Sequence, residues 1–286
     1  MEFVRPTTWR EALAVKADRP EAVPISGGTD LMVELNFDRR RPDVLLDLTG
    51  VPELAQWQRT DGTVRVGAGV PYSRIIGELG DVLPGLALAS RTVGSPQIRN
   101  RGTLAGNLAT ASPAGDALPP LVVADATVEV ESMSGGRSVA VREFFRGPKR
   151  SVLEPDELIR AVRIPVADGP EQFAKVGTRN AMVIAVCSFA LALHPERRGA
   201  AGCIGSAGPT VLPTPEADAF LAAELPWDAP SDLPDAVATR FGELVAAAAR
   251  PIDDVRGTAD YRRHAVGVLA RRTLRWAWDE HRGAAP

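Results

Sequence analysis

Hydrophobic and polar positions in the first two thirds of the chain form short runs separated by glycine, proline and polar residues. Alternating or continuous apolar runs predict strands at Ala22–Ser26, Val44–Leu48, Thr63–Ala68, Leu158–Ile164 and Glu171–Val176. Helices are predicted from Asp30 onward (LMVEL) and over Tyr72–Leu79, where Pro71 stands at a position that a first helical turn tolerates. Leu121–Ala124 is an apolar run and Thr127–Glu131 alternates. The pattern therefore predicts a first part of mixed helices and strands.

The pattern changes after about Arg179, where we place a domain boundary. Strand-like runs follow at Val183–Leu193 and Gly202–Ala207, then a proline-rich linker from Pro209 to Pro234, then helices at Asp235–Ala249 and Ala259–Trp278. In the last helix, apolar residues recur at helical spacing, which is typical of a face that packs in a core or against a partner. These residues are Tyr261, Ala265, Val268, Leu269 and Trp276.

Composition narrows the function classes. The formal net charge of −3 provides no basic surface for nucleic acid, and no apolar run has the length of a membrane span. The N-terminus (MEFVRPTTWREAL) lacks the apolar core of a signal peptide, which predicts a cytoplasmic protein. Cys187 and Cys203 form no CxxC pair, so we expect two separate buried thiols and neither a zinc site nor an iron–sulfur cluster. The three histidines are scattered, so no metal site is predicted.

Two segments rich in glycine and hydroxyl residues carry the candidate chemistry. Ile25–Leu31 reads ISGGTDL, and Ile98–Pro120 reads IRNRGTLAGNLATASPAGDALPP. Segments with so few bulky side chains let the backbone come close to a ligand and offer it amide and hydroxyl donors. Either segment alone is explained by a plain turn, with Asp30 as a helix N-cap in the first. Together they favour a cradle for a diphosphate.

Gly67 and Gly69 form a third glycine pair, which also lies between a predicted strand and a predicted helix. A dinucleotide-binding GxGxxG motif would have its third glycine at Tyr72, and no acidic residue ends a second strand at the expected distance. A tight turn accounts for these two glycines.

The two long segments, followed by FAKVGTRNAMVIAV (173–186), resemble the flavoprotein subunit of molybdenum-containing hydroxylases. That family includes the medium subunit of aerobic carbon monoxide dehydrogenase and the FAD domain of xanthine dehydrogenase. The resemblance covers essentially the whole chain. It implies an α+β protein, with two α/β subdomains of a PCMH-type FAD-binding fold over residues 1–178 (about 1–58 and 59–178). A smaller α+β C-terminal domain of a sheet and helices follows over 179–286.

The resemblance also implies which residues hold FAD. Backbone amides of Ser26–Asp30 would bind the pyrophosphate, with a second loop supplied by Thr103, Gly106 and Asn107, while Arg179 would lie in a loop that passes the flavin ring. The full implied set is Ile25, Ser26, Gly27, Gly28, Thr29, Asp30, Leu31, Val93, Thr103, Ala105, Gly106, Asn107, Thr110, Ser112, Asp116, Ile159 and Lys175. No catalytic side chain and no metal ligand is implied.

The sequence departs from the family pattern in two places. Ala105 stands where the second loop commonly has glycine, and its methyl group requires a permissible backbone angle there. Asn180, Ala181 and Met182 stand where xanthine dehydrogenases carry charged residues near the flavin. The second departure argues against assuming NAD as the terminal acceptor, and leaves FAD itself unaffected.

The implied function is electron transfer within an assembly. Non-covalent FAD in this chain would take electrons from [2Fe–2S] clusters of a small partner subunit, beside a large subunit that holds the molybdenum cofactor. It would pass them to NAD, a quinone or oxygen, in a dimer of heterotrimers. Two alternatives remain open from the sequence: a stand-alone FAD-dependent oxidase or reductase, and an assembly scaffold whose FAD site has decayed.

Overall fold

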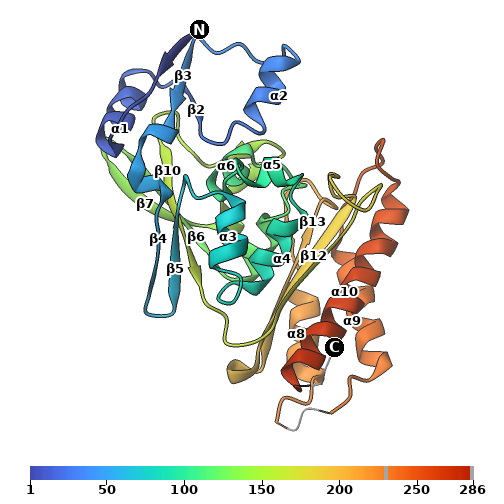
Figure 1. Ribbon diagram of the computed structural model, residues 1–286. Coiled ribbons are helices and arrows are strands. Elements are labelled where there is room, and N and C mark those ends of the chain that lie inside the picture. The colour runs from blue at the N-terminus through green and yellow to red at the C-terminus, as the bar shows by residue number, and fades with distance from the viewer. Residues whose placement is uncertain (229–230, 284–286) are drawn as a thin grey trace.

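The computed structural model describes residues 1–228 and 231–283; residues 229–230 and 284–286 of the expected C-terminal domain lie outside the described residues. The described chain combines parallel and antiparallel sheets with helices that pack on them, which confirms the α+β class (Figure 1). No helix in these ranges is both long and apolar enough to cross a membrane.

The N-terminal part is a small parallel sheet. Its strands are β1 (Glu2–Val4), β3 (Val44–Asp47) and β2 (Val23–Ile25), in that spatial order. Helix α1 (Trp9–Asp18) begins at a capping box, in which the Thr8 side chain accepts from the Glu11 amide and the Glu11 side chain accepts from the Thr8 amide. The first glycine-rich segment leaves the carboxyl end of β2 and leads to the short helix α2 (Leu31–Asn36).

A larger antiparallel sheet forms the centre of the molecule. Its strands, in spatial order, are β4 (Trp57–Thr60), β5 (Thr63–Gly67), β10 (Leu158–Pro165), β6 (Thr127–Ser132) and β7 (Gly135–Ala140). The accompanying elements are α3 (Tyr72–Glu78), α4 (Pro84–Thr92), α5 (Pro96–Arg99), α6 (Leu104–Thr110), α7 (Leu118–Val123) and the hairpin β8 (Phe145–Gly147) with β9 (Arg150–Ser151). Alternate residues of β6 are buried, as its period-2 pattern predicts.

The C-terminal sheet is antiparallel, in the order β11 (Glu171–Val176), β12 (Cys187–His194), β13 (Gly199–Gly205) and β14 (Leu212–Pro213). Three helices follow: α8 (Pro215–Glu224), α9 (Asp235–Ala248) and α10 (Ala259–His281). Every residue of β12 is buried because helices cover both faces of this sheet. Helices α9 and α10 lie on one face, whereas α4 and α7 reach the other from the central part (Figure 1).

Several local predictions differ from the structure. β12 begins only at Cys187, so residues 183–186 are loop rather than the strand predicted there, and the apolar run that starts at Leu121 lies in α7, which ends at Val123. The proline-rich linker contains β14 and α8, because Pro215 occupies the first turn of α8, where its missing amide hydrogen is not needed. β11 pairs with β12 along its whole length, so the C-terminal sheet includes Glu171–Val176. The domain boundary near Arg179 stays a prediction.

Candidate functional site

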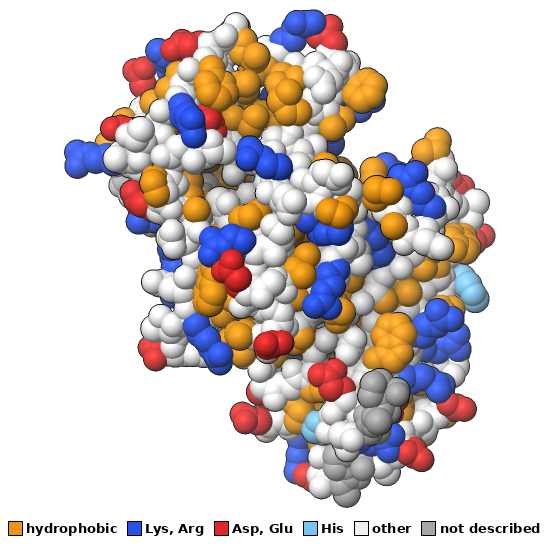
Figure 2. All heavy atoms as spheres, in the orientation of Figure 1, with side chains coloured by type: hydrophobic (Ala, Val, Ile, Leu, Met, Phe, Trp, Pro, Cys, Tyr) orange, Lys and Arg blue, Asp and Glu red, His pale blue; other side chains and the backbone are white. Residues whose placement is uncertain are grey.

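A cavity of about 780 Å³ lies between the parallel sheet, α6 and the loop that precedes β12. In Figure 2 this face of the molecule is notched between the upper lobe, which carries α2, and the C-terminal part. The volume is within the range of pockets that hold cofactors. The predicted site residues that line it are Ile25, Ser26, Gly27, Gly28, Thr29, Asp30, Leu31, Val93, Thr103, Gly106, Asn107, Thr110, Ser112 and Asp116.

The two glycine-rich segments meet at Gly27. A Cβ atom added to Gly27 would lie 1.9 Å from the carbonyl oxygen of Arg101 and 2.9 Å from the amide nitrogen of Gly102. Only glycine allows the two backbones to come this close. Gly28 has φ +73°, a left-handed conformation that also favours glycine. The convergence of the two segments, which the sequence could only suggest, is therefore built into their backbones.

The second segment is held by Thr103, which starts α6. Its hydroxyl accepts from the Gly106 amide at 3.0 Å, and its backbone forms an isolated bridge to Pro71. Ala105 is buried in α6 with an ordinary helical conformation, so its methyl group packs inside the protein and needs no special backbone angle. It does not line the cavity. A Cβ added to Gly106 would approach only the Thr103 Oγ1, at 3.2 Å.

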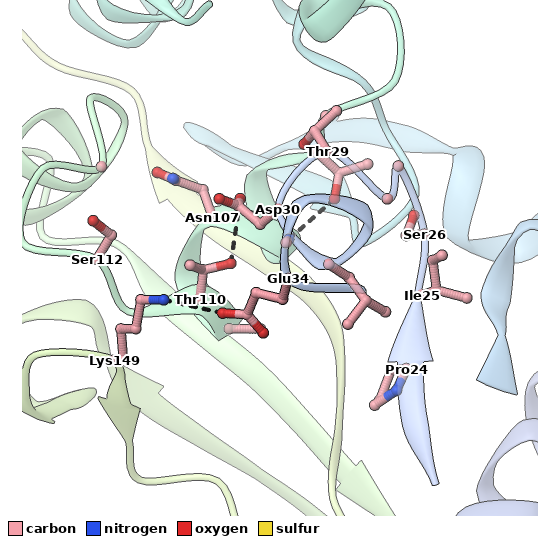
Figure 3. Close-up of a pocket in the computed structure, with 18 of the residues that line it drawn as sticks. Pro24, Ile25, Ser26, Thr29, Asp30, Glu34, Asn107, Thr110, Ser112 and Lys149 are labelled. Atoms are coloured by element: carbon pink, nitrogen blue, oxygen red, sulfur yellow. Dashed lines mark hydrogen bonds and ion pairs between the residues drawn. The ribbon is translucent and has the colours of Figure 1, made fainter. Parts of the chain in front are cut away.

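Polar side chains close one side of the cavity (Figure 3). Thr110 Oγ1 donates to Asp30 Oδ2 at 3.4 Å, which joins α6 to the first glycine-rich segment. Lys149 Nζ lies 3.0 Å from Glu34 Oε1, which joins the β8–β9 hairpin to α2. These contacts join elements that are far apart in the sequence across one side of the cavity.

Asp116 and Lys175 form a buried ion pair at the cavity wall. Lys175 Nζ donates to Asp116 Oδ2 at 2.5 Å, to the Thr92 carbonyl at 2.9 Å and to the Val183 carbonyl at 3.1 Å. Burial raises the pKa of Asp116 above its ordinary value, and the Lys175 charge opposes that rise. Asp116 lines the cavity, whereas Lys175 stands outside its lining and holds Asp116 in place.

Two further predicted residues lie away from the cavity lining. Ile159 is buried in β10 and belongs to the core of the central sheet. Arg179 Nε donates to the carbonyls of Ala181 and Met182, so its guanidinium folds its own loop. Met182, Val183 and Ile184 of that loop line the cavity instead.

Sequence reasoning missed Tyr72, Gly94 and Lys149, all of which line the cavity. Tyr72 stands in an apolar helical pattern that indicates a core residue, and its ring is indeed buried. No local signal in the sequence indicates that Tyr72 also lines a cavity formed by distant loops.

Three buried side-chain atoms in the cavity wall have no hydrogen-bond partner among the described residues. They are Tyr72 Oη, Asn107 Oδ1 and Asp116 Oδ1. Buried polar atoms are nearly always satisfied, so unsatisfied ones on residues that line a cavity call for a partner from outside the chain, either a water or a polar ligand. The glycine contact and these atoms fit a phosphorylated dinucleotide with hydroxyl groups.

A reactive thiol, or a set of side chains that could hold a metal ion, would be another source of chemistry in residues 1–228 and 231–283. Cys187 and Cys203 are free and buried, as expected, and burial raises the pKa of the Cys187 thiol to about 12. No group of three or more acidic, histidine or cysteine side chains in these ranges is placed to hold a metal ion. The arrangement therefore defines a protein with a large, polar, loop-lined site for a bound cofactor.

Comparison with known proteins identifies that cofactor. Residues 1–167 match the FAD binding domain in molybdopterin dehydrogenase, and residues 172–277 match the CO dehydrogenase flavoprotein C-terminal domain. The chain belongs to the family of FAD-binding subunits of molybdenum hydroxylases, as its motifs implied. It is thus an oxidoreductase flavoprotein subunit whose cofactor is FAD.

Relatives and solved structures agree over most of the chain. The nicotinate dehydrogenase FAD-subunit of Eubacterium barkeri is 36% identical over 221 residues, which are 71% of this chain and 74% of that protein. The glyceraldehyde dehydrogenase medium chain of Sulfolobus acidocaldarius is 30% identical over 276 residues, 96% of each. Quinoline 2-oxidoreductase from Pseudomonas putida 86 has a chain with TM-score 0.90 and 26% identity, covering 98% of this chain and 97% of its own. Reconstituted CO dehydrogenase from Oligotropha carboxidovorans gives TM-score 0.90 and 27% identity, covering 98% of each chain.

Proposed function

We propose that this chain is the electron-transfer subunit of a heteromeric molybdenum hydroxylase. A small partner subunit would carry the [2Fe–2S] clusters and a large one the molybdenum cofactor. FAD supplies the redox chemistry, since it exchanges electrons both with such clusters and with an acceptor such as NAD, a quinone or oxygen. The observation that carries the proposal is the cavity at the meeting point of the two glycine-rich segments, whose buried polar atoms lack protein partners.

In this proposal the chain's own residues bind and orient the cofactor. Amides of the Ser26–Asp30 segment and of the start of α6 would bind the diphosphate, while Gly27 lets the two glycine-rich backbones meet and Gly28 takes the left-handed conformation that the first segment needs. The ion pair with Lys175 holds Asp116 in the cavity lining, and its second carboxylate oxygen, which has no partner among the described residues, would accept a hydrogen bond from the cofactor. Burial of the pair keeps water away from that contact.

The substrate of the complex would be chosen outside this chain. Relatives of similar identity are named for different substrates. The two relatives above are named for nicotinate and glyceraldehyde, and a third, the nicotine 6-hydroxylase medium subunit from Paenarthrobacter nicotinovorans, is 30% identical to this chain. A shared FAD subunit with diverse substrates is what a substrate pocket in the large subunit predicts. A cytoplasmic location, expected from the N-terminal sequence, and a dimer of heterotrimers, implied by the family resemblance, complete the proposal.

Affinity purification of the tagged chain from its native host tests this assignment. We expect a complex with one large molybdenum-containing subunit and one small iron–sulfur subunit, and FAD released by denaturation without a covalent link. The isolated chain should bind FAD yet oxidise none of the complex's substrates. An isolated chain that turns over a small substrate by itself would favour the stand-alone oxidase or reductase, and recovery of FMN or of no flavin would contradict the cofactor site.

A further inference from the structure

Tyr72 presents a buried hydroxyl that the protein does not use. The residue lines the cavity and is 2% exposed, and its buried Oη has no hydrogen-bond partner among the described residues. A buried hydroxyl without a partner destabilises a folded protein relative to the same site with a hydrogen atom there. Because the residue lines the cavity, the missing hydrogen-bond partner can come from a molecule bound there.

The backbone places Tyr72 where the two glycine-rich segments meet. Its amide donates to the Gly102 carbonyl at 3.0 Å, and the preceding Pro71 bridges to Thr103. A Cβ added to Gly102 would lie 3.5 Å from Tyr72 Cδ2 and 3.4 Å from Thr29 Oγ1. The tyrosine ring thus lies beside Gly102 of the second segment, and Gly102 in turn lies beside Thr29 of the first.

The surroundings make this hydroxyl a hydrogen-bond donor. Burial, together with the nearby carboxylates of Asp116 and Asp30, raises the pKa of Tyr72 well above its ordinary value, so the proton stays on the oxygen. Two other lining residues have unpartnered atoms among the described residues, Asn107 Oδ1 and Asp116 Oδ1, and both are hydrogen-bond acceptors. Tyr72 therefore complements them by offering the cavity a fixed side-chain proton.

We propose that the Tyr72 hydroxyl donates a hydrogen bond to bound FAD, at an oxygen of the polar linker that joins its two rings. This linker contains the diphosphate and the ribityl chain, whose oxygens accept hydrogen bonds. The inference rests on the proposed function, in which FAD occupies this cavity. It assigns to Tyr72 a binding role that the glycine-rich motifs do not include.

The proposal makes two predictions of opposite direction for Tyr72→Phe. Loss of the hydroxyl should weaken FAD binding by roughly tenfold, as expected when one hydrogen bond to a charged or strongly polar oxygen is removed. The flavin-free protein should be as stable as the wild type or more stable, because phenylalanine fills the same space without the unsatisfied oxygen. A residue that served only the fold would not separate these two effects.

Titration of the flavin-free protein with FAD, followed by flavin fluorescence, measures the first effect, and thermal unfolding without FAD measures the second. Tyr261→Phe is the matched control, since Tyr261 is the chain's other tyrosine and is exposed on α10. The control should match the wild type in both measurements. ADP, used as a competitor of FAD, distinguishes a contact to the diphosphate from a contact to the ribityl chain, because of these two parts ADP contains only the diphosphate.

Equal weakening of ADP and FAD in Tyr72→Phe supports the proposal and assigns the contact to the diphosphate. Weakening of FAD alone supports it and assigns the contact to the ribityl chain. Unchanged FAD affinity, or a loss of flavin-free stability that accompanies weaker binding, overturns it. Wild-type protein that binds no FAD would instead refute the proposed function, so the two failures are distinct.

Discussion

Gly27 and Gly106 both stand in the glycine-rich segments, but the protein needs them for different reasons. The space that a Gly27 side chain would take is filled by the Arg101 carbonyl, whereas a Gly106 side chain would meet only the Thr103 hydroxyl. Gly27 therefore serves the folded chain itself. Gly106 faces the cavity, so the space beside it is free for a ligand.

Substitution of these glycines should separate folding from cofactor binding. Gly27→Ala should lower both the free energy of unfolding and FAD affinity, because a backbone must move by more than an ångström to relieve the contact. Gly106→Val should leave the stability of the flavin-free protein within about 1 kcal/mol of wild type, since valine costs little in a half-buried helix. Its FAD affinity should nevertheless fall at least tenfold.

Urea unfolding of the flavin-free variants and FAD titration check both expectations. Gly77→Ala is the control, because Gly77 lies in α3 with no heavy atom within 4 Å of an added Cβ. Alanine there should stabilise the protein by about 0.5–1 kcal/mol and leave FAD affinity unchanged. Full FAD occupancy in Gly106→Val would remove the start of α6 from the cofactor site.

At the scale of elements, Glu171 joins α4 to the first strand of the C-terminal sheet. Its Oε2 accepts from the Gly85 amide at 3.2 Å, and the side chain is buried against the start of α4. Burial raises the pKa of Glu171 from 4.5 to about 7, with a smaller contribution from the charge of Glu280. The junction between the two sheets thus contains a carboxyl group that holds its proton near neutral pH.

This raised pKa predicts how stability depends on pH. The folded state binds the Glu171 proton more tightly than the unfolded state, so the associated stability is present below about pH 4.5 and is lost as pH rises through 7. Glu171→Gln keeps an oxygen for the Gly85 amide and cannot ionise. Its free energy of unfolding should exceed that of wild type by about 2 kcal/mol at pH 8, and the difference should shrink at pH 5.

Urea unfolding at the two pH values measures this difference. Glu224→Gln, at an exposed position near the end of α8, should show no such pH-dependent gain. A constant difference between Glu171→Gln and wild type across the range would mean that Glu171 does not titrate near neutrality.

Elements differ in how far the sequence predicts them, and the reasons are physical. β3, β5 and α3 follow from local periodicity, and the glycine-rich segments follow from residue types that only a close backbone contact requires. The pairing of β11 with β12 joins two strands across a loop, and such a pairing leaves no local signal in the sequence.

The candidate site divides in the same way. The sequence motifs predicted Ser26 to Asp30 and Thr103 to Asn107. All of these residues line the cavity except Leu104 and Ala105, which are buried in the core. Tyr72 and Lys149 enter the site only through the folding of distant segments. Neither residue carries a signal of its own in the sequence.

On the scale of the whole molecule, the C-terminal sheet belongs to two hydrophobic cores. Phe189 and Leu191 of β12 point toward α9 and α10, whereas Ala190 and Ala192 point toward the core of the central part. The small side chains on the second face let α4 and α7 lie close to the sheet. The same sheet supplies Lys175, which pairs with Asp116 in the cavity wall.

Removal of the C-terminal sheet should therefore destroy the FAD site as well as the packing of the sheet against α4 and α7. A fragment of residues 1–168 would expose the buried face of α4 and α7 and would leave Asp116 without its cation, a loss of about 3–5 kcal/mol for a buried pair. We expect this fragment to aggregate in size-exclusion chromatography and to bind no FAD. Co-expression with residues 169–286 should restore a soluble FAD-binding complex, because that piece returns both the sheet and Lys175. A monomeric fragment that unfolds cooperatively and retains FAD would show instead that the central part supports the site without the sheet.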